Sequence, residues 1–125
     1  MIPDNFKTLV DKLKEKTTRK ETIWSNTGRD DIFKLDLVKG AITVNRWKNE
    51  TGQQFVDVSI INERGDKIDN ICFHDGEIDD YKYLAELHSL AKRAYYKVDE
   101  TFKTILEELD SDKIIGIDRV SDLPF

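Results

Sequence analysis

The fold is decided by the stretch from residue 32 to residue 74, which reads IFKLDLVKGAITVNRWKNETGQQFVDVSIINERGDKIDNICFH. Apolar and polar residues alternate there in several short runs, a period that is typical of half-buried β-strands. Turn-forming groups separate the runs at 39–40, 49–52 and 63–66. Strands joined by such short turns pair as antiparallel neighbours. We therefore predict an antiparallel β-meander of four or five strands over residues 22–74.

Helical spacing appears on both sides of this meander. An apolar stripe at intervals of three and four residues predicts a first helix over residues 1–18. After the meander, similar stripes predict a helical pair over 79–110, bent near Lys97 and packed on the sheet. The stripes consist of Phe6, Leu9, Val10 and Leu13, then Leu84, Leu87, Leu90, Ala91, Ala94 and Tyr95, then Phe102, Ile105, Leu106 and Leu109. Residues 111–125 form a tail that either docks or is flexible. The whole chain is thus expected to be a single α+β domain.

Composition narrows the classes of protein that fit. The chain has 125 residues, of which 38% are hydrophobic and 36% charged, as expected of one folded domain with a modest core. The net charge of −5 argues against general nucleic-acid binding. Cys72 is the only cysteine, which excludes an internal disulfide and suggests a buried, inert thiol. Neither a signal peptide nor a membrane span is recognisable, so we expect a cytoplasmic protein without membrane contact.

The predicted sheet has apolar residues on both faces. One set, on the face expected to lie under the helical pair, contains Ile42, Val44, Val56, Val58 and Ile60. Trp47, Phe55 and Ile61 alternate to the opposite face. A bare face with a Trp and a Phe would be an exposed apolar patch. We expect it to be covered either by the first helix, by the tail or by another chain.

Tyrosines gather on the helix that follows the meander. They are Tyr81, Tyr83, Tyr95 and Tyr96, with Lys92 and Arg93 between them. Tyr and Arg are enriched at protein interfaces, although such tyrosines can also frame a core. Together with the second sheet face, this gives the predicted partner-binding residues Trp47, Phe55, Ile61, Tyr81, Tyr95 and Arg93.

The densest polar cluster lies between His74 and Asp80, HDGEIDD. Clustered carboxylates can bind hard cations, but the spacing does not match the calcium-loop signature, and acids also suit a helix N-terminus. Cys72 and His74 are too few for a zinc site. The six glycines stand singly, so phosphate-binding glycine loops are absent. We therefore assign no catalytic residue, metal ligand or cofactor.

Charge is segregated along the chain. Residues 7–20 contain six basic and two acidic side chains, and residues 99–112 contain six acidic side chains and one lysine. The two segments could attract each other, within one chain or between chains. Alternatively, the basic helix could contact phosphates while Trp24 stacks on a base.

One further observation concerns short runs in the second half of the chain. Residues 84–87 read LAEL, residues 91–94 read AKRA and residues 98–100 read VDE. Over residues 6–110 the chain resembles a set of uncharacterised small bacterial α+β proteins with a helix, a β-meander and two C-terminal helices. The resemblance implies a bacterial or mobile-element origin and no assigned activity.

These features favour a non-enzymatic protein-interaction module, with self-association into a dimer as one form. A phage or mobile-element inhibitor or accessory protein is an alternative. A metal-dependent hydrolase or nuclease using the His74–Asp80 cluster is another. The partner, if there is one, should be a protein.

Overall fold

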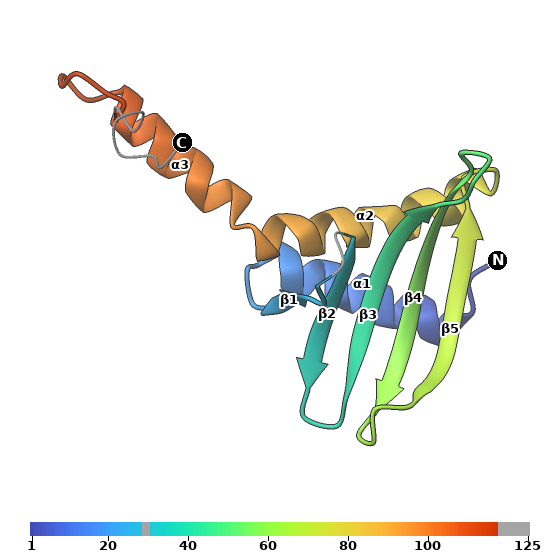
Figure 1. Ribbon diagram of the computed structural model, residues 1–125. Coiled ribbons are helices and arrows are strands. Elements are labelled where there is room, and N and C mark those ends of the chain that lie inside the picture. Colours follow the sequence, from blue (N-terminus) through green and yellow to red (C-terminus); the bar gives the residue numbers. More distant parts are fainter. Residues whose placement is uncertain (29–30, 118–125) are drawn as a thin grey trace.

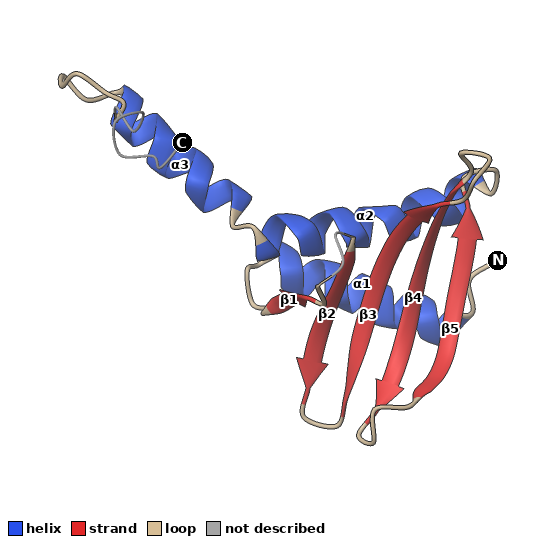
Figure 2. Ribbon diagram, in the orientation of Figure 1, coloured by secondary structure: helices blue, strands red, loops and turns tan. Residues whose placement is uncertain are grey.

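The computed structural model describes residues 1–28 and 31–117. The chain begins with helix α1 (Asp4–Thr18) and continues into five strands. The strands are β1 (Trp24–Asn26), β2 (Ile32–Leu37), β3 (Gly40–Lys48), β4 (Gln54–Asn62) and β5 (Lys67–His74). Helices α2 (Ile78–Tyr95) and α3 (Val98–Leu109) follow (Figures 1 and 2). No helix within the described ranges is long and apolar enough to cross a membrane.

The five strands form one open antiparallel sheet in the order β1-β2-β3-β4-β5. The longest pairing joins β3 to β4, with Val44 opposite Val58. Gly40 begins β3 where a side chain would not fit, because an added Cβ would lie 2.5 Å from the carbonyl oxygen of Ile61. The meander therefore has the neighbour order that its short turns predict.

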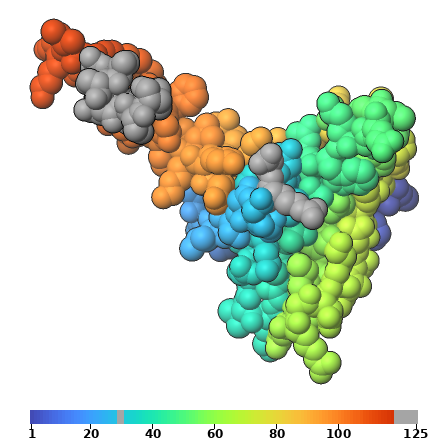
Figure 3. Space-filling view, in the orientation of Figure 1, coloured from blue at the N-terminus to red at the C-terminus, as the bar shows by residue number. Residues whose placement is uncertain are grey.

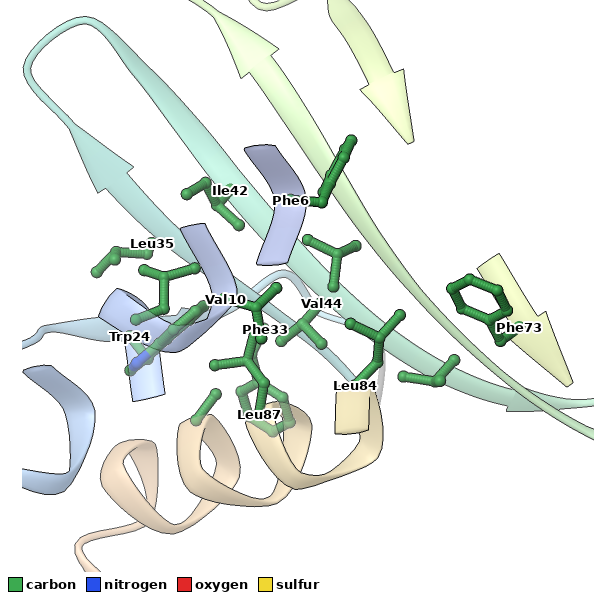
Figure 4. Packing of buried hydrophobic residues seen from close by; sticks show 14 residues of the cluster. Phe6, Val10, Trp24, Phe33, Leu35, Ile42, Val44, Phe73, Leu84 and Leu87 are labelled. Carbon is green, nitrogen blue, oxygen red and sulfur yellow. The ribbon is translucent and has the colours of Figure 1, made fainter. Parts of the chain in front are cut away.

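Helices α1 and α2 lie on the same face of the sheet (Figures 1 and 2). Between them and the strands lies one apolar core, part of which is shown in Figure 4. Its buried members are Phe6, Val10, Leu13, Trp24, Phe33, Leu35, Ile42, Val44, Val56, Val58, Phe73, Leu84, Leu87 and Ala91. The alternation of the strands and the helical spacing of α1 and α2 bring these residues to one layer. Full burial of each large aliphatic side chain contributes about 1.5–3 kcal/mol.

Polar contacts fix the two helices against each other and against β1. The Tyr83 hydroxyl of α2 donates to the Asp11 carboxylate of α1. Lys14 lies 3.7 Å from the centre of the Tyr83 ring. The Trp24 indole N–H donates to Thr17 Oγ1 at 3.1 Å, so this buried donor is satisfied.

The predicted fold class is confirmed: an N-terminal helix, five antiparallel strands in one sheet and two C-terminal helices. Two details differ from the expectations. Helix α3 contacts only α2 among the described elements and buries no residue. Cys72 is exposed, since it lies opposite Asp57 on the face away from the helices. Residues 111–117 of the tail form no helix or strand, and residues 118–125 lie outside the described residues.

His88 of α2 is a polar residue inside the core, with only 2% of its surface exposed. Its Nε2 lies 2.8 Å from the carbonyl oxygen of Asp31, which can only accept, so Nε2 carries the proton. The ring also packs edge-on against Phe33. This contact ties α2 to the connection that leads into β2.

The core should respond to truncation far more than the surface does. Changing Leu84→Ala removes part of a fully buried side chain and should lower the free energy of unfolding by about 2–5 kcal/mol. Ile68 is 61% exposed, so Ile68→Ala should change it by less than about 0.5 kcal/mol. Urea denaturation of the two variants checks this. Equal losses would mean that Leu84 is not part of the core.

The buried imidazole should also make stability depend on pH. Burial lowers the pKa of His88 below its ordinary value of 6.5, and Arg46 and Lys92 act in the same direction. The hydrogen bond to the Asp31 carbonyl and the Asp31 charge oppose this lowering. Below pH 6.5 the unfolded chain therefore binds a proton that the folded chain does not.

We expect the His88 contribution to stability to be complete above about pH 7.5 and to fall as the pH decreases through 6.5 towards the lowered pKa. Urea denaturation of the wild type and of His88→Gln at several pH values measures this contribution. The carboxylates affect the free energy of unfolding equally in both proteins. The difference between the two slopes of this free energy against pH therefore gives the contribution of His88 alone. Parallel pH profiles would contradict a neutral, buried His88.

Candidate interaction surface

Helix α3 projects away from the body formed by the sheet, α1 and α2 (Figure 3). The change of direction occurs at Lys97, whose left-handed backbone (φ 52°) separates α2 from α3. Two ion pairs span this elbow. Arg93 of α2 binds Asp99 at 2.6 Å, and Lys20 beyond α1 binds Glu100 at 3.0 Å. These contacts connect the first turn of α3 to the body.

The Lys20–Glu100 pair brings the basic start of the chain next to its acidic end. Attraction between these segments within one chain was one of the two possibilities that the charge pattern suggested. Hydrogen bonds from Arg93 and Lys20 lower the pKa values of Asp99 and Glu100 respectively. Both pairs are solvent-exposed, so they orient α3 and add little to the stability of the fold.

No described residue covers the apolar stripe of α3. Four large side chains at helical spacing are exposed: Phe102 (63%), Ile105 (51%), Leu106 (53%) and Leu109 (55%). Sequence reasoning placed this stripe on the sheet, whereas none of the helix is buried by the described residues. Exposed apolar patches are a feature of interaction sites, so the stripe is the candidate interaction surface of this protein. Just beyond it, Ile114 and Ile117 are exposed as well.

The polar side of α3 is acidic. The helix contains four carboxylates and one base, Lys103. Asp99 and Glu100 are neutralised by the elbow contacts, whereas Glu107 and Glu108 have no ion pair within the described residues. The exposed half of α3 is therefore an apolar stripe beside negative charge.

The second sheet face has no described element over it. There Trp47 and Phe55 stack with ring centres 4.2 Å apart, and the Trp47 indole donates to Asp57 at 3.2 Å. Ile61 lies near the opposite end of the same face, paired with Ala41. Polar residues lie between these ends, where Asn70 donates to Ser59 Oγ at 2.8 Å. The expectation that α1 covers this face is wrong, because α1 lies beside α2.

The other three predicted partner-binding residues lie elsewhere. Tyr81 is half-buried and hydrogen-bonds to Gln54 on the helix side of the sheet. Tyr95 packs near Phe33 at the C-terminal end of α2, and Arg93 holds the elbow. The structure therefore brings Trp47 and Phe55 together, and distributes Ile61, Tyr81, Tyr95 and Arg93 among separate regions.

The His74–Asp80 cluster is built as a strand-to-helix turn. The Gly76 N–H donates to His74 Nδ1 at 3.0 Å, and His74 Nε2 lies 3.1 Å from the Glu77 carboxylate. Both ring nitrogens are thus used within the turn. Among the described residues, no three His, Cys, Asp or Glu side chains are grouped as a metal site would require.

The proposed stacking of Trp24 on a nucleic-acid base is also contradicted. Trp24 is only 4% exposed, because its indole packs between α1 and the sheet. Two basic side chains of this part of the chain are paired with carboxylates, Lys14 with Glu86 at 3.6 Å and Arg19 with Glu15 at 2.7 Å. Helix α1 packs its apolar side into the core and has its charged side in solvent.

Comparison with known proteins adds no relative: no family model, no curated protein and no solved structure matches this chain.

If α3 contributes nothing to the core, polar substitutions in its stripe should be tolerated. We expect the double variant Ile105→Asp, Leu109→Asp to change the free energy of unfolding of the body by less than about 0.5 kcal/mol per site. Thermal unfolding followed by near-ultraviolet circular dichroism measures this change. A loss of several kcal/mol would show that the stripe is buried against the body.

Proposed function

We propose that the protein is a non-enzymatic interaction module whose α3 stripe binds an amphipathic helix of a partner protein. The observation that carries the proposal is the exposure of Phe102, Ile105, Leu106 and Leu109 on one projecting helix. Apolar residues at this spacing are the anchors used when a helix docks into a groove or against another helix. The hydroxyl-rich or charged surface expected of a solvent-facing helix is lacking on that side.

The charge of α3 favours a partner with basic residues beside its apolar seam. If two copies of the chain paired through α3, Glu107 and Glu108 of one copy would lie close to the carboxylates of the other, and these like charges would repel. A lysine- or arginine-flanked helix would instead meet opposite charge along the same contact. Helix α3 is also short, about 18 Å long, so pairing of two copies through α3 alone would give a small interface.

A membrane surface is a poorer fit to the same stripe. Helices that lie on membranes carry Lys and Arg on their polar face, where they meet anionic lipids. The polar side of α3 carries four carboxylates and one lysine, and anionic lipids would repel these carboxylates.

The alternative of a metal-dependent hydrolase lacks support. Both ring nitrogens of His74 make contacts within the strand-to-helix turn, with Gly76 and Glu77.

A pair of synthetic helical peptides tests the proposal. Both have the same Leu and Ile seam, with Lys and Arg as flanking residues in one and Glu in the other. We expect the basic peptide to bind the full chain, more weakly as salt is raised, and the acidic peptide not to bind. Isothermal titration calorimetry provides the affinities.

Matched variants locate the binding. Ile105→Asp with Leu109→Asp should abolish binding, whereas Val38→Asp, at an apolar turn residue that is 97% exposed, should leave it unchanged. Equal binding of the two peptides, or equal loss in Val38→Asp, would contradict the proposal. Light scattering of the free protein adds one more outcome. A stable dimer that the double variant dissociates would make a second copy the occupant of the stripe.

A further inference from the structure

A polar cleft of about 420 Å³ lies between the end of β3 and the middle of α2. Arg46, Trp47 and Lys48 line it from the strand side, and His88 and Lys92 line it from the helix side. Asp31, at the start of β2, completes the wall. None of these residues belongs to the α3 stripe, so the cleft is independent of the proposed function.

The charge in the cleft is opposite to that of the chain. Three cationic side chains, Arg46, Lys48 and Lys92, face a single carboxylate, Asp31. Lys92 pairs with Asp31 at 3.7 Å, which leaves Arg46 and Lys48 without a carboxylate partner among the described residues. In a chain with a net charge of −5, such a concentration of positive charge makes a local site for anions.

Arg46 is held in place before any ligand arrives. Its Nη2 donates to Gln54 Oε1 at 3.3 Å and to the Tyr81 hydroxyl at 3.2 Å. The guanidinium also lies 5.9 Å from the centre of the Tyr81 ring. Its remaining N–H groups make no side-chain hydrogen bond to a described residue. A planar guanidinium fixed in this way can bind a phosphate or carboxylate with two parallel hydrogen bonds.

His88, which also lines the cleft, has a buried hydrogen-bond acceptor. Because its Nε2–H donates to the Asp31 carbonyl, its Nδ1 can only accept. That Nδ1 is buried and is the one such side-chain atom without a hydrogen-bond partner in the described part of the chain. A buried acceptor of this kind is stabilised by a hydroxyl or N–H donor.

We infer that this cleft is a binding site for a small organic anion that carries a hydroxyl or N–H group. The phosphate or carboxylate lies among Arg46, Lys48 and Lys92, and the donor group satisfies the His88 side of the cleft. Phosphate esters of sugars and hydroxycarboxylates share this chemistry. A nucleic-acid strand is a poorer fit, because the chain as a whole carries a net charge of −5.

The test uses the full chain labelled with ¹⁵N and three probes: ribose 5-phosphate, citrate and inorganic phosphate. Each is titrated at constant ionic strength against sodium chloride. We expect saturable shifts of the backbone amides of Arg46, Lys48 and Lys92, with dissociation constants at or below about 1 mM. Tighter binding of ribose 5-phosphate or of citrate identifies the anion as a phosphate or a carboxylate. Inorganic phosphate has a hydroxyl only on the phosphorus itself, so its weaker binding would support the role of a separate donor group.

Two double variants with the same change in charge separate the cleft from a general effect. Lys48→Gln with Lys92→Gln should weaken binding about tenfold. Lys34→Gln with Lys39→Gln should weaken it less than about twofold, because Lys34 lies on the opposite face of the sheet and Lys39 lies in the turn between β2 and β3. Lys39, Lys48 and Lys92 are exposed and Lys34 is half-buried, and the same spectra report whether the variants are folded. The inference is overturned if no probe gives saturable shifts, or if the two double variants lose affinity equally.

Discussion

The structure depends on burial at a single face of the sheet. Two helices that are far apart in the sequence, α1 and α2, both pack on that face, and together with the strands they close one core. Phe6 and Val10 come from one helix and Leu84 and Leu87 from the other. Because α1 and α2 already cover that face, no room is left on it for a third helix. The exposure of α3 is therefore a consequence of how the core is closed.

The same constraint explains what sequence reasoning could and could not predict. Period-two alternation and short turns are local signals, so the meander and its buried residues, such as Val44 and Val58, could be read directly. An amphipathic stripe shows that a helix has an apolar side but not what covers it, which is why α3 was placed on the sheet. Cys72 was misplaced because its strand has weak alternation, with Asp69 and Asn70 next to Ile71. The acidic flank of α3 was the available hint that this stripe differs from that of α2.

The cleft could not be predicted because its parts are separated in the sequence. Arg46 and His88 are brought together only when α2 packs on β3, and the contact between His88 and Asp31 joins two distant segments. Taken alone, each is an ordinary residue: a cation on a strand and a histidine on an apolar helix side. Tertiary packing brings them together in one cleft, where fixed positive charge lies beside a buried imidazole. The polar cluster that stands out in the sequence, His74–Asp80, instead forms a strand-to-helix turn that is stabilised by its own hydrogen bonds.

The two candidate surfaces also differ in what the fold requires of them. His88 and Arg46 are partly explained by packing, since both make contacts that stabilise the body. The α3 stripe has no such explanation: twelve residues are too few for a stable isolated helix in water, and none of them contributes to the core. Four large apolar side chains exposed on a marginal helix are unfavourable in a protein that stays alone. A contact that buries Phe102, Ile105, Leu106 and Leu109 would both remove that apolar surface from water and stabilise the helix that presents it.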